Sequence, residues 1–214
     1  MLQSAIKGLH RAMHHPFVYD VVRPLLVGGV ELKPLYDQIQ GPGAVILDVG
    51  CGTGSALRYL RSFESYVGMD TDPIAVNHAR ARHGSSRVSF QARACTPEDV
   101  RRVAPTHVVL AGVLHHLSNG EARGLLASLS ESPRLQLVLT ADIVFLPGHR
   151  VGNWLASIDR GEFCRTEQGY LELAQGSRLD LRSRFIARSR PRTGIGKYLY
   201  MTLAPRSPSG AALP

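Results

Sequence analysis

The sequence lacks a long apolar run, a signal peptide and a metal-binding cysteine pattern. No stretch approaches the ~20 apolar residues that a membrane-spanning helix needs. The first ten residues lack the continuous apolar core of a secretory signal. The three cysteines, Cys51, Cys95 and Cys164, are widely spaced and cannot all pair, which fits a reducing compartment. We therefore expect a cytoplasmic protein.

Lysine is also scarce, so arginine supplies nearly all of the net charge of +8. An excess of positive charge suits an anionic substrate, nucleic acid or an acidic membrane surface. A genome that favours arginine codons explains it equally well, and the charge alone therefore selects no function. The length of 214 residues allows one complete α/β domain and little more.

The chain divides into three parts. Residues 1–40 are expected to form an N-terminal helical lid, because apolar residues recur there at helical spacing before prolines divide the segment. Residues 41–204 are expected to form the main domain, in which residues 147–175 are an insertion that covers the substrate. Residues 205–214 are rich in proline, glycine, serine and alanine and are expected to be a disordered tail.

Strands and helices alternate through the main domain. Asp72-Pro73 is a helix start, and Ser118 with Glu121 forms a capping box that begins another helix. This alternation predicts a parallel sheet with helices on both faces. The expected strands are residues 45–48, 66–70, 88–92, 106–112 and 135–140, followed by helices at 153–157 and 167–175. Residues 179–188 and 197–203 are expected to form an antiparallel hairpin at the sheet edge.

The most informative segment reads Val-Ile-Leu-Asp-Val-Gly-Cys-Gly-Thr-Gly, from residue 45 to residue 54. A buried strand ends in Asp48, and glycines follow at alternate positions. Glycine lets the chain bend sharply and lets a ligand come close to the backbone, and open α/β sheets bind ligands at this end of their strands. Dinucleotide sites prefer Gly-x-Gly-x-x-Gly, so the spacing disfavours a nicotinamide-dependent oxidoreductase. The acid suits a ligand with an amino group and no phosphate, such as S-adenosylmethionine.

The segment resembles the first motif of the Rossmann-like, class I S-adenosylmethionine-dependent methyltransferases. The resemblance covers roughly residues 41–145 and implies an α/β fold with a seven-stranded, mostly parallel sheet, the last strand antiparallel. It implies S-adenosylmethionine as the methyl donor and S-adenosylhomocysteine as the product. The residues that it assigns to the cofactor are Asp48, Gly50, Cys51, Gly52, Gly54, Asp70, Thr71, Ala94, Cys95 and Gly112.

Asp70 lies 22 positions after Asp48, at the end of the second expected strand. An acid at about this distance binds ribose hydroxyls in nucleotide-binding sheets. The alternative, that Asp70 caps the next helix, is less favoured because Asp72 is better placed to do so.

The loop after the third expected strand departs from the family pattern. Related methyltransferases often carry an acid there that reads the adenine amino group. Residues 91–96 contain no acid, and the first acid after them is Glu98. The adenine contact is therefore assigned to the backbone of Ala94 and Cys95.

The segment Gly112-Val-Leu-His-His-Leu117 strongly resembles the motif after the fourth strand of small-molecule methyltransferases. This places His115 or His116 near the methyl-transfer centre, where a neutral histidine can deprotonate a hydroxyl or an amine. The alternative is that the pair only shapes the pocket, since many methyl transfers proceed mainly by positioning.

Two arginine-rich regions bear on the acceptor. Residues 147–166 contain Arg150, Trp154, Arg160, Phe163 and Arg165, which suit either a partly apolar, partly cationic pocket or a solvated surface. In the hairpin, alternation places Arg182, Arg184, Arg188 and Arg190 on one strand face, where they could follow phosphates or lie in solvent. The sequence contains no Asn-Pro-Pro-Tyr or Asp-Pro-Pro-Tyr stretch, which disfavours methylation of an exocyclic base amine. No Asp-Asn pair follows Asp142, so we expect no magnesium-dependent site and no metal.

These observations favour methyl transfer to oxygen, nitrogen or carbon of a small-molecule acceptor, a natural product or lipid-like metabolite. The alternative is an RNA methyltransferase that uses the basic hairpin. A binding module that keeps the cofactor without turnover is the third hypothesis. The sequence leaves the acceptor and the oligomeric state open.

Overall fold

The computed structural model describes residues 29–39, 41–149, 153, 162–189 and 196–206. Most of the predicted N-terminal lid lies outside the described residues, as does the predicted tail from residue 207. The same holds for Arg150, Trp154, Arg160, Arg190 and Arg192. Within the described residues, no helix has both the length and the apolar character needed to cross a membrane.

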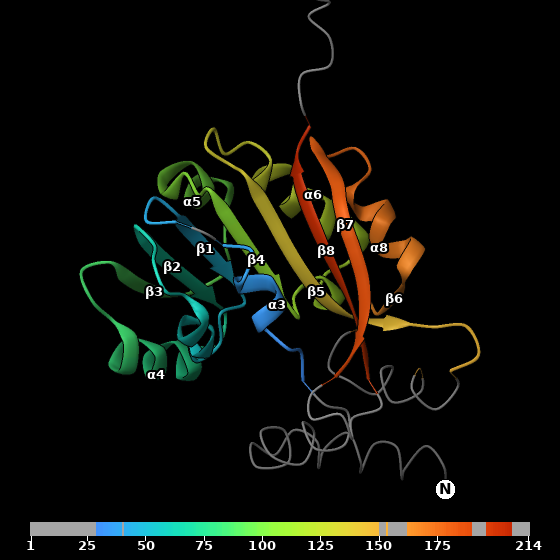
Figure 1. Cartoon of the computed structure of the whole chain (residues 1–214), viewed down its shortest axis with the longest axis horizontal. Coiled ribbons are helices and arrows are strands. Elements are labelled where there is room, and N and C mark those ends of the chain that lie inside the picture. The colour runs from blue at the N-terminus through green and yellow to red at the C-terminus, as the bar shows by residue number, and fades with distance from the viewer. Residues whose placement is uncertain (1–28, 40, 150–152, 154–161, 190–195, 207–214) are drawn as a thin grey trace, which may run out of the picture.

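Seven strands form one continuous sheet in the order β3-β2-β1-β4-β5-β8-β7 (Figure 1). Neighbours are parallel from β3 to β5, and β8 is antiparallel to both β5 and β7. The predicted seven-stranded sheet with its last strand antiparallel is confirmed. The two-residue β6 (Arg165–Thr166) pairs with β5 off this path. The strands of the sheet are β1 (Val45–Val49), β2 (Ser65–Asp70), β3 (Val88–Ala92), β4 (His107–Ala111), β5 (Leu137–Phe145), β7 (Leu179–Arg188) and β8 (Lys197–Pro205).

Helices cover both faces of the sheet, as predicted (Figure 1). One face carries α3 (Lys33–Tyr36), the 3₁₀ turn η2 (Ser55–Tyr59) and α4 (Pro73–His83). The other carries α5 (Pro97–Val103), α6 (Asn119–Leu129) and α8 (Glu167–Ala174). The helix starts follow the sequence signals, because the Asp72 side chain caps α4 and the predicted capping box begins α6.

Two predicted boundaries are wrong. The fifth strand does not end at residue 140 but continues through Phe145, so Asp142 lies inside β5 and is buried. The strand tolerates this carboxylate because the backbone N–H of His115 donates to it and β8 pairs alongside. The last strand includes Pro205, one residue of the predicted tail.

Parts of the predicted lid and insertion belong to the core. Leu35 and Tyr36 of α3 are fully buried against the sheet. Tyr170 and Leu173 of α8 are buried on the other face, where α8 packs beside α6. Covering the substrate therefore stays a prediction for the remainder of these two segments.

Candidate active site

The carboxyl ends of β1, β2 and β4 bring three predicted segments together. The backbone N–H of Gly50 donates to the carbonyl of Met69 at 2.7 Å, which ties the glycine turn to β2. A Cβ atom placed on Gly50 would lie 2.6 Å from Cγ2 of Val113, in the loop after β4. The glycine turn, the end of β2 and the loop after β4 therefore adjoin one another, as the sequence predicted for a ligand site.

The glycine turn is strained for any other residue. Gly50, Gly52 and Gly54 have φ angles of 76°, 52° and 71°, all left-handed. A Cβ on Gly50 would overlap Val113, whereas one on Gly52 would meet no atom of the described residues within 4 Å. Gly52 thus leaves open space where a ligand can approach the backbone.

Asp70 faces this turn. Its Oδ2 accepts the backbone N–H of Gly52 at 2.8 Å, and its Oδ1 accepts the N–H of Asp72 at 2.9 Å. Asp72 caps α4 with its own carboxylate, as predicted. Thr71 between them is exposed at the same rim. The ribose contact of Asp70 stays a prediction.

Asp48 lies beneath the turn and is only 2% exposed. The hydroxyl groups of Tyr36 and Tyr66 both donate to its Oδ2, each at 2.5 Å. Burial raises the pKa of Asp48 to about 6, the two phenol hydrogen bonds oppose this shift, and the charge of Asp70 adds to it. No local pattern in the sequence indicates these two tyrosines, which come from α3 and β2.

The two predicted histidines have different surroundings. His115, in the turn η3 (Leu114–His116), is 3% exposed, and its Nδ1 lies 2.8 Å from Oδ1 of Asp142. His116 is exposed, and its ring centroid lies 4.2 Å from that of His115. Gly112 has a φ of 74°, and a Cβ there would lie 3.6 Å from Cε1 of His115. Only His115 therefore has a buried acid behind it.

Comparison with known families decides the assignment of this region. Residues 46–133 match the family described as "Methyltransferase domain". These residues are a methyltransferase domain. The match spans the glycine turn, Asp70 and the loop after β4, and it supports an S-adenosylmethionine-dependent enzyme of class I, as the motifs indicated. No curated protein matches the chain.

Solved structures agree on the fold. Geranyl diphosphate C-methyltransferase from Streptomyces coelicolor A3(2) has a TM-score of 0.61 and 17% identity over 81% of this chain and 79% of that one. An S-adenosylmethionine-dependent methyltransferase from Methanosarcina mazei has a TM-score of 0.63 and 13% identity over 83% and 100%. A TehB-like methyltransferase from Corynebacterium glutamicum has a TM-score of 0.56 and 19% identity over 82% and 87%.

The residues of the methyltransferase domain fit S-adenosylmethionine. This cofactor carries two positive groups, an ammonium and a sulfonium. The pKa of Asp48 is raised chiefly by burial and further by the charge of Asp70, and a cation at the turn would favour the ionised form of both acids. Gly52 provides the close backbone approach that such a ligand requires. The donor set and the space around the turn therefore agree with the cofactor.

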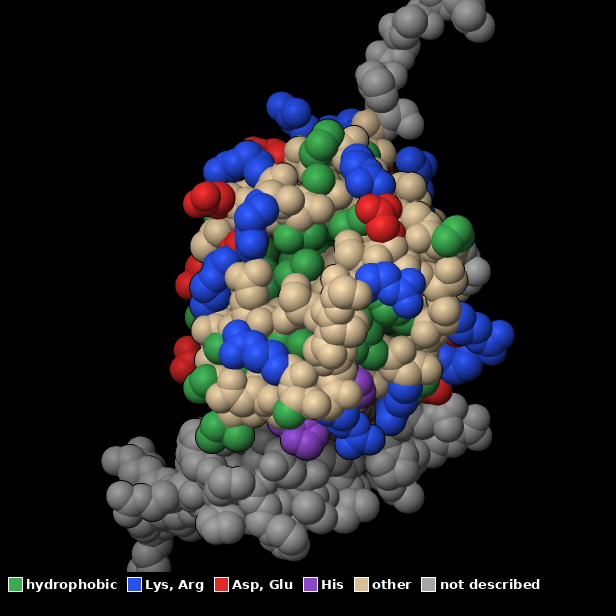
Figure 2. Space-filling view, turned by 90° about the vertical axis from the view of Figure 1, so that its left-hand side faces the viewer, with side chains coloured by type: hydrophobic (Ala, Val, Ile, Leu, Met, Phe, Trp, Pro, Cys, Tyr) green, Lys and Arg blue, Asp and Glu red, His purple; other side chains and the backbone are tan. Residues whose placement is uncertain are grey.

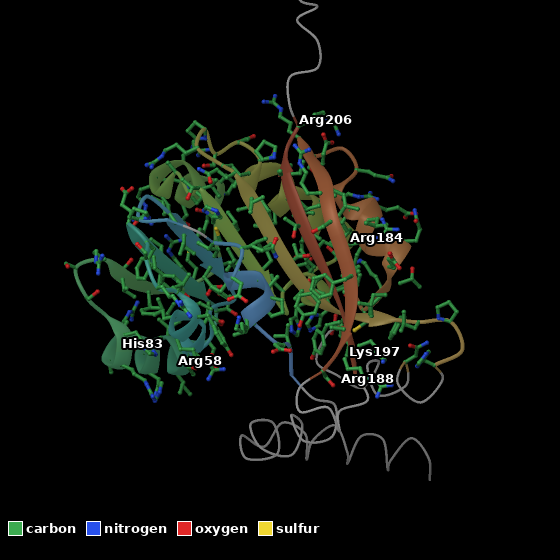
Figure 3. All side chains as sticks on the ribbon, viewed as in Figure 1. Arg58, His83, Arg184, Arg188, Lys197 and Arg206 are labelled. Carbon is green, nitrogen blue, oxygen red and sulfur yellow. The ribbon has the colours of Figure 1, made fainter. Side chains whose placement is uncertain are left out.

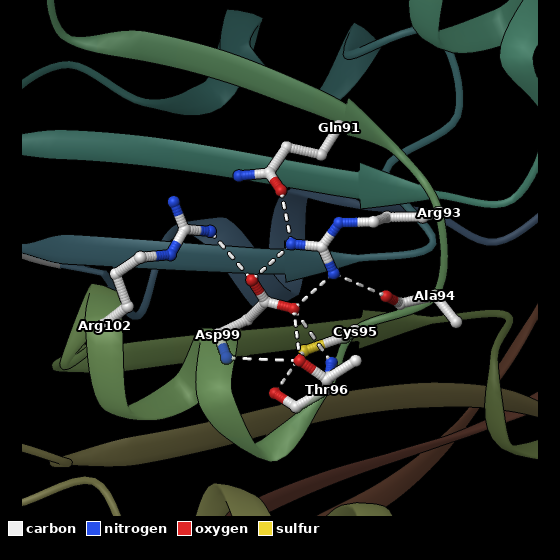
Figure 4. Close-up of polar contacts among 7 residues, drawn as sticks. All are labelled: Gln91, Arg93, Ala94, Cys95, Thr96, Asp99 and Arg102. Carbon is white, nitrogen blue, oxygen red and sulfur yellow. Dashed lines mark hydrogen bonds and ion pairs between the residues drawn. The ribbon is translucent and has the colours of Figure 1, made fainter.

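The loop after β3 is held by an ion-pair cluster centred on Asp99, which is 2% exposed (Figure 4). Arg93 donates to both carboxylate oxygens at 2.5 Å, Arg102 donates at 2.7 Å, and Thr96 completes a capping box. The hydrogen bonds from Arg93 hold the pKa of Asp99 well below its usual range. Arg93 also donates to the carbonyl of Ala94 at 3.1 Å. The cluster therefore fixes the loop that is predicted to contact adenine.

The cysteine thiols are poor nucleophiles. Burial raises the pKa of Cys51 far above its usual value and that of Cys95 to about 11. Both stay protonated at neutral pH, so their predicted roles rest on the backbone. Within the described ranges, no group of three or more His, Cys, Asp or Glu residues is arranged to hold a metal.

Arg165 fits neither alternative that the sequence left open. Its guanidinium donates to the carbonyls of Leu114, Leu117 and Phe163 at 2.6–2.8 Å and to the side chain of Asn119 at 2.9 Å. Arg165 is thus neither a pocket cation nor solvated, and it ties the loop after β4 to β6. Three of its partners, Leu114, Leu117 and Asn119, lie 46 to 51 residues away in sequence, so no local pattern could have indicated this role.

The hairpin arginines do not form one continuous face. A register shift between Leu181 and Ser183 places Arg182 at a β-bulge and interrupts the expected alternation. Arg184, in the middle of β7, pairs with Glu167 of α8, while Arg206 pairs with Asp180 at 3.0 Å near the opposite end from Arg188 (Figure 3). On the face beyond β3, Lys and Arg side chains lie at separate places, with Asp and Glu among them (Figure 2).

Proposed function

We propose that the methyltransferase domain transfers a methyl group from S-adenosylmethionine to a small-molecule acceptor. The observation that carries the proposal is the open space at Gly52 beside two repelling acids, Asp48 and Asp70. The loop after β4, with its buried His115–Asp142 pair, supports an enclosed reaction site rather than an open groove.

The roles follow from position. Asp70 binds the ribose hydroxyls, Asp48 balances the charge of the amino-acid end, and the backbone at Ala94 and Cys95 contacts the adenine. When bound, S-adenosylmethionine supplies a methyl group on a good leaving group. The chain therefore has to align the acceptor with this methyl group and exclude water.

Titration calorimetry with S-adenosylhomocysteine tests the proposal. Wild type is expected to bind, and Asp70→Ala is expected to weaken binding at least tenfold through the loss of charge-assisted hydrogen bonds. The matched control is Asp180→Ala, an acid of the β7 edge that pairs with Arg206. Failure of wild type to bind would remove the proposed function, and unchanged binding by Asp70→Ala would remove the ribose role.

RNA as the acceptor stays the alternative, because the net charge is +8. The acidic partners of Arg184 and Arg206 and the bulge at Arg182 weigh against a phosphate-tracking face. A gel shift with bulk RNA at 50 and 200 mM salt distinguishes the two acceptors. If the protein contacts RNA phosphates, its affinity for RNA should fall steeply as the salt concentration rises. The absence of a shift favours the small-molecule acceptor.

We also infer a reducing, cytoplasmic location. The structure joins none of Cys51, Cys95 and Cys164 in a disulfide. Free thiols persist where glutathione and thioredoxin keep cysteines reduced. Labelling of all three thiols in freshly prepared, unfolded protein would agree, and a native disulfide would not.

A further inference from the structure

His115 and Asp142 form a buried pair whose hydrogen positions can be assigned. Oδ1 of Asp142 accepts the backbone N–H of His115 at 3.1 Å and faces its Nδ1 at 2.8 Å. A carboxylate oxygen can only accept, so Nδ1 carries the hydrogen. In the neutral imidazole the remaining ring nitrogen, Nε2, then holds a lone pair and can take a proton.

The pair and the nearby Thr140 contain polar atoms that have no partner in the described part of the protein. Nε2 of His115, Oδ2 of Asp142 and Oγ1 of Thr140 are buried without a hydrogen-bond partner there. Thr140 and Asp142 lie two residues apart on β5 and so share one face of the sheet. Native proteins leave few buried polar atoms unpaired, because each costs about 1–3 kcal/mol. Nε2 is therefore available to a hydrogen-bond donor that enters the site.

The location of the ring connects the unused nitrogen to the reaction site. Cε1 of His115, the atom between the two ring nitrogens, faces Gly112 in the turn that adjoins the glycine turn. The carbonyl of His115 accepts the backbone N–H of Phe163 at 3.0 Å, and Arg165 binds the carbonyl of Leu114. The loop that carries the ring is therefore fixed from two sides, as a group that must be positioned for proton transfer requires.

We propose that His115, oriented by Asp142, is the general base that removes the proton of a hydroxyl group on the acceptor, which makes the protein an O-methyltransferase. This inference rests on the proposed methyl transfer. The acceptor O–H gives its proton to Nε2 while the oxygen forms a bond to the methyl carbon. The carbon–sulfur bond breaks, and its electron pair stays on sulfur, leaving neutral S-adenosylhomocysteine. The imidazolium, stabilised by the Asp142 carboxylate, later releases the proton to solvent.

The need for a base selects the acceptor class. A phenol has a pKa of about 10 and an alcohol a higher one, so both are neutral at pH 7 and require a base as they react. A thiol, with a pKa of about 8.5, supplies its own thiolate, and a neutral amine already has a free lone pair. A base therefore contributes more to methylation of a hydroxyl than of a thiol or a neutral amine, and this difference favours a hydroxyl acceptor, with Asp142 as the positioning residue.

The first test reads the imidazole directly and needs no turnover. Long-range ¹⁵N NMR of the full chain with S-adenosylhomocysteine bound should show His115 protonated at Nδ1 and unprotonated at Nε2. Asp142→Asn should lose this single tautomer, because an amide can also donate to Nδ1. The control is His78→Gln, an exposed position on α4. A wild-type signal protonated at Nε2, or an unchanged signal in Asp142→Asn, would overturn the proposal.

The second test measures S-adenosylhomocysteine release with phenol, 2-naphthol and 1-decanol, compared with 2-naphthylamine and 2-naphthalenethiol. Wild type should methylate a hydroxyl probe, and His115→Gln and Asp142→Asn should lower kcat by about 10²-fold with KM unchanged. The thiol rate should survive both substitutions. A wild type that binds S-adenosylhomocysteine but leaves every hydroxyl probe unmethylated overturns the acceptor class, and equal loss on all probes overturns the base. If wild type does not bind S-adenosylhomocysteine at all, the proposed methyl transfer itself is wrong, and the acceptor class and the base fall with it.

Discussion

Asp48→Asn should make the protein more stable at neutral pH and weaken its binding of the cofactor. The pKa of Asp48 rises from 3.8 to about 6 in the folded protein, chiefly through burial. A shift of about two units corresponds to roughly 3 kcal/mol of folding free energy. Because the folded pKa is the higher one, the protonated acid favours folding below pH 4, and this contribution is lost as pH rises through 6. The asparagine carbonyl can still accept from Tyr36 and Tyr66.

Urea denaturation of both proteins between pH 4 and pH 7.5 measures this effect. The stability of Asp48→Asn relative to wild type should increase by up to about 3 kcal/mol across that range. Asp99→Asn is the matched contrast, because the pKa of Asp99 is lowered, so its contribution is present above pH 4 and lost only below. A difference between Asp48→Asn and wild type that is independent of pH would refute the reasoning.

Calorimetry completes the test. If Asp48 balances a cation, S-adenosylhomocysteine should bind wild type more tightly as pH rises through 6, by up to about tenfold per unit of pKa shift. Binding to Asp48→Asn should be weaker and flat over the same range. A parallel pH dependence in both proteins would assign the linkage to another group.

Three further substitutions have expected outcomes. Gly50→Ala should destabilise the protein by about 2 kcal/mol or more, because its φ is 76° and its Cβ would overlap Val113; Gly124→Ala, at an exposed helical position with nothing within 4 Å, should instead stabilise by up to about 1 kcal/mol in the same thermal melts. Asp99→Ala should cost about 2 kcal/mol in urea denaturation at pH 7, since two arginines lose their shared partner; a cost equal to that of Glu131→Ala, an exposed acid, would contradict this. Arg165→Lys should lower the melting temperature and kcat while leaving S-adenosylhomocysteine binding intact, because an ammonium cannot reach four acceptors at once; Arg123→Lys, exposed on α6, should change neither.

The sequence predicts the fold where the signal is local. The start of α4 at Asp72-Pro73 and the capping box of α6 depend on residues within one helical turn, and both are confirmed. The predicted end of β5, at residue 140, is wrong, because an acid such as Asp142 is unusual inside a buried strand. Here Oδ1 of Asp142 is paired with His115, which lies 27 residues away, and no local pattern contains that contact.

The same distinction applies to the site. The glycine turn and Asp70 could be predicted, because their spacing follows from the strand–turn–helix unit that contains them. Tyr36 and Tyr66 could not, since their contacts with Asp48 form only when α3 and β2 pack beside β1. The residues that position the predicted side chains are thus the ones that tertiary structure alone reveals.

Two buried carboxylates lie on opposite faces of the sheet and differ in what they can do. Asp48 shares its face with Tyr36 and Tyr66, whose hydroxyl groups end the network. Asp142 lies on the opposite face and binds Nδ1 of His115. The second ring nitrogen, Nε2, can pass the effect of this charge on to the acceptor hydroxyl. Within the reaction, Asp48 should therefore influence cofactor binding, and Asp142 should influence proton transfer. The double variant Asp48→Asn/His115→Gln should show the binding loss of the first substitution and the kcat loss of the second, with free energies that add within about 0.5 kcal/mol. A larger coupling would mean that the two faces share one network.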